Sequence, residues 1–261
     1  MLPATIPIRA ISRGIAVLQA LNRGRSLSMM EIANASAVPY PTACRIVQTL
    51  ILENLVEREP SRRRYRPTAL VQTLAHGFQG QGPLIQAARP HIVELTHLSS
   101  WPVSLTTHVG ASMILRDSTH ALTSMTLNSY FPGYTLPILE SAAGLVYLAY
   151  APADEREGVL HSLEMLTLDE VPHGLRLIRE SSATDIVREQ GYATRGHNRF
   201  TENPGKTSSI AVPVMHGDKV AGAITLAFFS AAFGMDDALA RFEKPLKRCA
   251  ERISGDLLVA A

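Results

Sequence analysis

Apolar residues recur at helical spacing in successive segments near the start of the 261-residue chain. In residues 10–22 they fall on one stripe with polar residues opposite, which predicts an amphipathic helix. Ser28 and Glu31 then form a capping-box pattern, in which each side chain bonds the free backbone amide of the other residue. This pattern predicts a second, short helix that runs through Ala35.

A third helical pattern follows Pro41, and its start is sharply set. Proline suits the first helical position because its missing N–H costs nothing there, and it drives Tyr40 before it towards an extended conformation. One stripe of this segment is apolar and can pack against neighbouring elements. The opposite, polar stripe consists of Thr42, Arg45, Gln48 and Thr49.

Alternating residues predict a hairpin after these helices, with strands at 55–58 and 62–66 and a turn at 59–61. Two helices with a short turn, followed by an arginine-loaded hairpin, is the order of a winged helix-turn-helix. In that fold the later helix enters the major groove and contacts base edges, whereas cations on the hairpin lie along the DNA backbone or the minor groove. The candidate DNA-binding residues are Ser28, Tyr40, Pro41, Thr42, Ala43, Arg45, Gln48, Thr49, Arg62, Arg63, Arg64 and Arg66.

Each of these features has a plainer interpretation when it is taken alone. An amphipathic helix is commonly a packed helix, and a cluster of arginines is commonly a solvated surface. Their order within about 60 residues favours nucleic-acid binding over these alternatives.

The charge distribution supports the same hypothesis. Residues 1–80 hold ten Arg, no Lys and four Glu, a net charge of +6, whereas residues 81–261 hold 15 basic and 19 acidic residues, a net charge of −4. The basic charge of the front segment is entirely guanidinium, which suits bidentate contact with phosphate or guanine. The sequence therefore predicts a small polyanion-binding module joined to a larger, mildly acidic one.

The larger module has the pattern of an α+β domain. A short linker helix is predicted at 68–75, and glycines break it at 77–83, which places the segments at 1–67, 68–83 and 84–261. Sheet strands with helices on their flanks suit a pocket for a small molecule. Further helices are predicted at 84–99 (kinked by Pro90), 138–150, 153–162, 174–190 and 236–258, and strands at 103–108, 112–116, 121–126, 209–214 and 220–226.

Short pieces of the front segment carry a more specific resemblance. These pieces are Arg13-Gly14-Ile15, Glu31-Ile32-Ala33, Val38-Pro39, Thr42-Ala43-Cys44-Arg45, Leu55-Val56-Glu57-Arg58 and Tyr65-Arg66. They resemble the winged helix-turn-helix domain of the IclR family of bacterial transcriptional regulators. The chain departs from the family at Pro41, where a serine or another polar residue is common, so the usual hydroxyl contact is missing there.

The back segment also resembles this family, in which it is a GAF-like effector-binding domain that contributes to oligomer contacts. The matching pieces are Leu136-Pro137, Ser141-Ala142-Ala143-Gly144, Glu189-Gln190-Gly191-Tyr192 and Ile210-Ala211-Val212-Pro213. Trp101-Pro102, Arg116 and Thr119-His120 are similar, more narrowly, to regulators of hydroxyphenylpropionate catabolism. The resemblance implies operator DNA, a small-molecule effector, RNA polymerase and a second copy of the chain as candidate partners, in a homodimer or a dimer of dimers.

Effector contacts carried over from the family fall at Ala142, Ala143, Asn198, Ser209, Thr225 and Ala227. The alanines stand where several relatives have polar side chains, which favours an aromatic acid over a very small polar acid. The strand patterns add Thr106, His108, Met113, Leu115 and Phe131 as candidate lining, with Arg116 as a candidate carboxylate partner. Each of these added residues has an alternative interpretation as a packed or solvated side chain.

Other classes of protein find little support in the sequence. No apolar run of membrane-spanning length and no signal-peptide pattern occurs, so we expect a cytoplasmic protein. Cys44 and Cys249 are too few for a disulfide framework, and the spacing of the histidines does not indicate a metal site. We expect no cofactor. The alternative from another class is a cytosolic enzyme acting on a small organic acid, and no catalytic motif supports it.

Overall fold

The computed structural model describes residues 8–23, 26–75, 82–126, 130–166, 173–180, 182–196 and 206–259. The chain divides into two compact units, residues 1–80 and 81–261. The division falls inside the predicted linker. Each unit has a hydrophobic core of its own.

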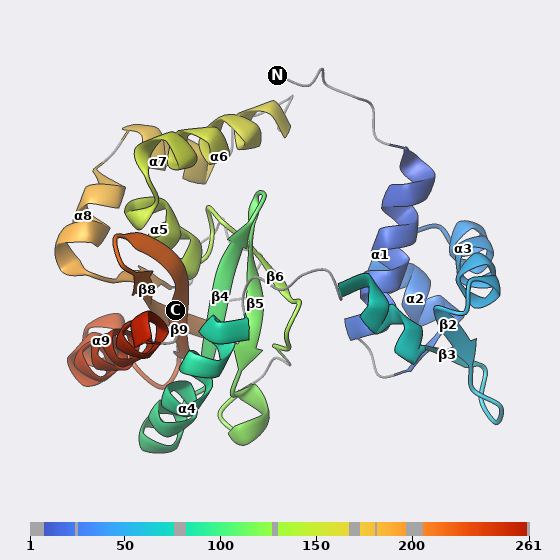
Figure 1. The fold of residues 1–261 in the computed structure, drawn as a ribbon, viewed down its shortest axis with the longest axis horizontal. Helices are drawn as coiled ribbons and strands as arrows, with labels where there is room; N and C mark the ends of the chain where they lie inside the picture. Colours follow the sequence, from blue (N-terminus) through green and yellow to red (C-terminus); the bar gives the residue numbers. More distant parts are fainter. Residues whose placement is uncertain are drawn as a thin grey trace. The chain divides into compact units, whose positions relative to one another are not determined.

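Three helices form most of the first unit (Figure 1). They are α1 (Arg9–Arg23), α2 (Met29–Ser36) and α3 (Tyr40–Leu52). Val17 and Leu21 of α1, Ile32 of α2 and Val47 of α3 are fully buried against one another. The apolar stripes of the sequence therefore meet in one small core.

Local backbone conformations and caps set where α2 begins and ends and where α3 begins. The Ser28 hydroxyl accepts from the backbone N–H of Glu31, and the backbone N–H of Ser28 donates to the Glu31 carboxylate over 2.7 Å, as the capping box predicts. Ala37 ends α2 in the left-handed region at φ 51°. Helix α3 starts at Tyr40, one residue before the predicted start, with Pro39 as its N-cap. Tyr40 is therefore helical and not extended.

A three-stranded antiparallel sheet completes the first unit, in the order β1-β3-β2. The predicted hairpin is present as β2 (Val56–Arg58) and β3 (Arg64–Pro67). The two-residue strand β1 (Leu27–Ser28), which the sequence analysis missed, pairs with β3 and ties the hairpin to α2. The predicted linker helix is a 3-10 helix, η1 (Ala69–Ala75).

The second unit is built on a six-stranded antiparallel sheet with the order β6-β5-β4-β9-β8-β7. The first three strands in the chain are β4 (Val103–Val109), β5 (Ser112–Ser118) and β6 (Thr135–Pro137). The last three are β7 (Ala193–Arg195), β8 (Thr207–His216) and β9 (Lys219–Phe229). Strands β7 and β6 therefore lie at opposite edges of the sheet.

Helices cover both faces of this sheet (Figure 1). One face packs against α4 (Gly82–Ser99, with Pro90 inside) and α9 (Met235–Val259). The other core is formed with α5 (Ala142–Tyr150), α6 (Ala153–Leu166), α7 (His173–Glu180) and α8 (Ala183–Gln190). Ile210 and Leu226 point to the α4–α9 core, whereas Ala211 and Ala223 belong to the other core, as alternation along a strand requires.

Two secondary-structure predictions for this unit were wrong. Residues 121–126 are not a strand, because a 3-10 turn, η2 (His120–Leu122), comes first. The Thr123 hydroxyl then bonds the Ser100 carbonyl and the Met125 amide, so a side chain replaces ladder hydrogen bonds. The predicted helix 174–190 is two helices, α7 and α8, with α8 starting after Ser182. Serine side chains compete for backbone groups and favour helix ends.

Candidate functional site

The outer surface of α3 presents the polar stripe that the sequence predicts. Arg45, Gln48 and Thr49 are exposed and Thr42 is half-buried, while Val47 on the opposite stripe is fully buried. The Thr49 hydroxyl donates back to the Arg45 carbonyl, so Arg45 and Gln48 are the exposed side chains suited to base edges. This surface is therefore polar, and the opposite side of the helix is anchored in the hydrophobic core.

Several predicted DNA-binding residues have other environments. Ala43 is fully buried in the helical core, so its prediction as a DNA contact is corrected: it sits one residue from the polar stripe and points inwards. The Ser28 hydroxyl is occupied by the α2 cap. Tyr40 and Pro41 are both exposed at the start of α3.

The arginines of the hairpin form two groups, those that are bonded within the unit and those that are exposed. Arg64 donates through Nε and Nη2 to the Ser26 carbonyl and forms an ion pair with Glu31 at 2.9 Å, and Arg66 forms an ion pair with Glu57 at 2.6 Å. Arg62 and Arg63 are exposed at the turn and form no ion pair within the described residues. Arg62 and Arg63 are therefore the hairpin cations that are available to a phosphate backbone.

Arg64→Ala and Arg63→Ala are expected to separate structure from binding. Loss of Arg64 removes the bonds that join β3 to the start of α2, so backbone amides of α2 should exchange faster in hydrogen-exchange mass spectrometry of the full chain. Arg63→Ala should leave this exchange unchanged. Equal exchange in the two variants would show that the Arg64 contacts do not hold the module together.

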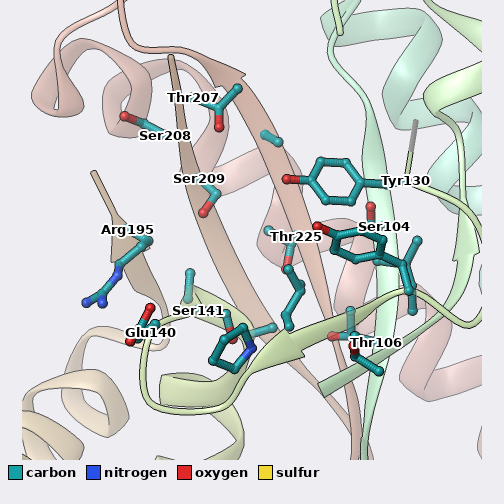
Figure 2. A pocket seen from close by; sticks show the side chains of 18 of the residues that line it. Ser104, Thr106, Tyr130, Glu140, Ser141, Arg195, Thr207, Ser208, Ser209 and Thr225 are labelled. Carbon is teal, nitrogen blue, oxygen red and sulfur yellow. The ribbon is translucent and has the colours of Figure 1, made fainter. Parts of the chain in front are cut away.

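A cavity of about 510 Å³ lies in the second unit, on the face of the sheet that carries α5 (Figure 2). Its floor consists of alternate strand residues whose neighbours point to the α4–α9 core. These floor residues are Ser104, Thr106, Ser209, Thr225 and Ala227. The volume falls in the range of about 300–1,000 Å³ that small-molecule sites occupy.

The cavity brings together most of the predicted effector contacts. Thr106, Leu115, Ala142, Ala143, Ser209, Thr225 and Ala227 all line it. The prediction for four other residues is corrected, since none of them belongs to the lining: Met113 is fully buried in the core, His108 stacks on Tyr147 at 4.2 Å between ring centroids, Phe131 packs edge-on against Tyr134, and Arg116 lies elsewhere on β5. Asn198 lies outside the described residues.

Charged residues at one end of the cavity were missed in the sequence. Arg195, at the end of β7, and Glu140, just before α5, both line it. Burial lowers the pKa of Arg195, and the Glu140 charge raises it to a smaller extent. Helix α5 begins at the same end, with the Ser141 hydroxyl accepting from the Gly144 N–H over 3.1 Å. The only sequence signal was the Ser141 cap, because a three-residue strand such as β7 is too short to show a period.

His120 was also missed, and it lines the cavity after β5. The residue is 6% exposed, and burial lowers the pKa of its side chain from 6.5 to about 4. Its Nδ1 is hydrogen-bonded to the Ser118 hydroxyl, and its ring packs edge-on against Tyr130 at 4.7 Å between centroids. The ring is thus neutral at physiological pH.

Acidification is expected to destabilise the protein through His120. The unfolded chain takes up this proton near pH 6.5 and the folded chain only near pH 4, so the free energy of unfolding should fall as pH drops through this interval. Urea unfolding at pH 7 and pH 5 should show a smaller difference in His120→Asn than in the wild type. The exposed His97 serves as a control, and His97→Asn should keep the wild-type difference. An unchanged pH dependence in His120→Asn would contradict the argument.

Neither a metal centre nor a membrane helix emerges from the part of the chain that the structure describes. No three His, Cys, Asp or Glu residues there are grouped to hold a metal ion. No described helix is long and apolar enough to cross a membrane. Cys44 and Cys249 are free thiols, and burial raises the pKa of Cys249 to about 12.

Comparison with known proteins assigns both units. Residues 10–60 match the IclR helix-turn-helix domain, and residues 79–255 match the C-terminal domain of the bacterial transcriptional regulator IclR. The chain belongs to the IclR family. Members of this family are transcriptional regulators and not enzymes, which removes the alternative of an enzyme acting on a small organic acid.

Two helix-turn-helix-type transcriptional regulators match this chain, one along nearly all of it and the other along part of it. The regulator KdgR of Escherichia coli K12 is 25% identical over 260 residues, covering 96% of this chain and 93% of KdgR. The regulator TsaQ1/TsaQ2 of Comamonas testosteroni is 24% identical over 158 residues, or 60% of this chain, and the match spans 56% of the length of that regulator.

Solved IclR structures share the fold. An IclR homologue from Microbacterium hydrocarbonoxydans, complexed with 4-hydroxybenzoate, has a TM-score of 0.67 at 22% identity, covering 97% of this chain and all of that one. The IclR protein of Thermotoga maritima has a TM-score of 0.65 at 19% identity, with 97% of this chain and all of that chain covered.

Proposed function

We propose that this IclR-family regulator binds operator DNA as an oligomer, with α3 in the major groove and the β2–β3 turn on the backbone. The single observation that carries the proposal is the two-sided character of α3. Val47 and Ala43 anchor the helix in the core, while Arg45 and Gln48 stand exposed on its other side. Arginine and glutamine are side chains that bind guanine and adenine edges, respectively.

An oligomer follows from the small size of the DNA-binding unit. One winged module covers a single half-site, and contacts with phosphates alone are weak and sensitive to salt. Tight operator binding therefore requires at least a dimer on two half-sites. Such a protein acts in the cytoplasm, where the bacterial chromosome lies.

The cavity of the second unit is proposed to bind the controlling effector, an aromatic carboxylic acid. Arg195 and the N-terminal amides of α5 provide positive potential at one end. Leu115, Leu136 and Ala227 provide apolar surface that fits a ring. The 4-hydroxybenzoate bound by the homologue of the same fold is a molecule of this class.

The DNA-binding proposal is tested by selection from a random duplex library, followed by footprinting of the selected site. We expect protection of two half-sites whose centres are about ten base pairs apart, or a multiple of that spacing. Sedimentation of the complex should give at least two chains per duplex. Selection that enriches no sequence above the starting library would refute operator binding.

The effector proposal is tested by calorimetry and thermal unfolding with benzoates and phenylalkanoates. We expect at least one acid to bind and to change the operator affinity, because a ligand that favours one spacing of the DNA-binding units shifts their population. If no acid of the series binds, the aromatic-acid assignment is wrong, while the DNA-binding assignment stands on its own experiment.

A further inference from the structure

Three cavity-lining residues carry buried polar atoms without a hydrogen-bond partner among the described residues. These atoms are Arg195 Nε, Thr225 Oγ1 and His120 Nε2. A buried polar group without a partner is destabilising, so it is retained in a fold mainly where something else bonds it. Of the three, Arg195 Nε and His120 Nε2 belong to residues far apart along the cavity, and they indicate where the ligand of this cavity places its own polar atoms.

The first of these atoms belongs to the cationic end of the cavity. Arg195 ends β7, one edge strand of the sheet, and Figure 2 shows its guanidinium beside Glu140. No ion pair joins the two in the described part of the chain. Because a guanidinium has five donors in a fork, Arg195 can bind a ligand carboxylate while Glu140 remains nearby. Glu140 then repels the same carboxylate, which gives the two residues opposite effects on affinity.

The last of these atoms lies towards the opposite edge of the sheet. His120 follows β5, which is next to the other edge strand, and it packs against Tyr130. In Figure 2 Tyr130 lies across the cavity from Arg195. A ligand that reaches both Arg195 and His120 must therefore span the face of the sheet.

The Ser118 hydroxyl determines what His120 offers to a ligand. Ser118 Oγ accepts from the backbone N–H of His120 and is also hydrogen-bonded to Nδ1 of the ring, and we assign the hydroxyl hydrogen to this second bond. A neutral ring that accepts at Nδ1 carries its hydrogen on Nε2. In this tautomer the unpartnered Nε2–H is a donor, and it is suited to an oxygen acceptor on the ligand.

We infer that the effector has a carboxylate that binds Arg195 and, across an apolar spacer, an oxygen that accepts from His120 Nε2. This inference rests on the proposed function of the cavity as the effector site. Hydroxyaryl carboxylic acids fit it, because the apolar lining residues Leu115, Leu136 and Ala227 provide the surface for the ring. Arg195 and His120 become the residues that determine specificity for charge and for the distal oxygen.

The inference is tested by calorimetry of the full-length protein with 4-hydroxybenzoate and with 3-(3-hydroxyphenyl)- and 3-(4-hydroxyphenyl)propionate. Each acid is compared with its amide and with its counterpart without the hydroxyl group. Arg195→Gln is expected to weaken acid binding about tenfold or more, and Arg195→Lys to restore part of it, without a matching change for the amide. Glu140→Gln should strengthen acid binding. Arg116→Gln, which removes a cation outside the cavity lining, is the matched control and should bind as the wild type does.

The distal end is tested with two His120 variants. Asparagine can keep an acceptor near Ser118 and lacks the Nε2 donor, whereas glutamine can reach the Nε2 position with its own N–H. His120→Asn should weaken binding of the hydroxylated acids about threefold to tenfold and leave the unsubstituted acids unchanged, and His120→Gln should retain more of the preference. Thermal unfolding of each variant without ligand checks that it is folded.

The outcomes distinguish this inference from the function on which it rests. If the wild type binds none of the acids, both the effector class and this inference are wrong. If it binds acids but Arg195→Gln and Arg116→Gln weaken them equally, only the assignment of the carboxylate to Arg195 is overturned. If His120→Asn weakens hydroxylated and unsubstituted acids equally, the assignment of the distal oxygen is overturned.

Discussion

Gly144→Ala is expected to unfold the corner of the effector domain where α5 begins, with a loss of several kcal/mol of stability. A Cβ at this position would lie 1.9 Å from the Ile138 carbonyl oxygen and 2.6 Å from its carbon. Real Cβ atoms do not approach backbone atoms so closely, and a backbone segment moves less easily than a side chain. Because Ile138 and Gly144 are joined by the turn that holds Glu140 and Ser141, the cavity should lose its shape as well.

Gly158→Ala is the matched control for this prediction. Gly158 also lies inside a helix, α6, but a Cβ there meets nothing within 4 Å. Alanine is favoured over glycine in a helix by about 0.5–1 kcal/mol, so Gly158→Ala should be neutral or slightly stabilising. Urea unfolding followed by circular dichroism compares the two variants. Equal unfolding midpoints would mean that the close approach at Gly144 is relieved at little cost.

Arg45→Ala is expected to reduce affinity for the selected operator by about 1–3 kcal/mol and to relax the preference at one base pair. Arg45 is exposed on the polar stripe of α3, and the opposite side of this helix is buried in the core. Loss of the Arg45 side chain should therefore leave the fold unchanged. Arg63→Ala should instead weaken binding to all duplexes similarly and reduce the salt slope by about one. Titrations of operator and scrambled duplexes at several salt concentrations give both quantities.

The comparison between these two arginines decides the assignment of roles. If Arg45→Ala weakens operator and scrambled DNA by the same factor, Arg45 contacts the backbone and not a base. If Arg63→Ala changes sequence preference, the hairpin reads DNA shape or sequence in addition to phosphate. Unchanged hydrogen exchange in α2 and α3 would exclude a folding defect in either variant.

The DNA-binding unit was largely predictable because its signals are local. A capping box needs only Ser28 and Glu31, and the two stripes of α3 follow from helical spacing. The pairing of Arg64 with Ser26 and Glu31 was not predictable, since it depends on β3 lying against β1. The strand pattern thus placed the arginines on the hairpin. It could not show which of them form contacts within the DNA-binding unit and which are available to DNA.

The sequence by itself determined the amphipathic helices, most of the long strands, the basic front segment and the resemblance to IclR regulators. Each of these depends on neighbours a few residues apart or on residue type alone. Only the tertiary structure decided that Arg195 and His120 line one cavity, because they lie 75 positions apart on elements that strand pairing brings to one sheet face. It also decided that Gly144 has no room for a side chain, since that depends on the path of the Ile138 backbone. Periodicity shows which face of a helix or strand a residue occupies. Which residues it contacts there is decided by the way distant strands pair.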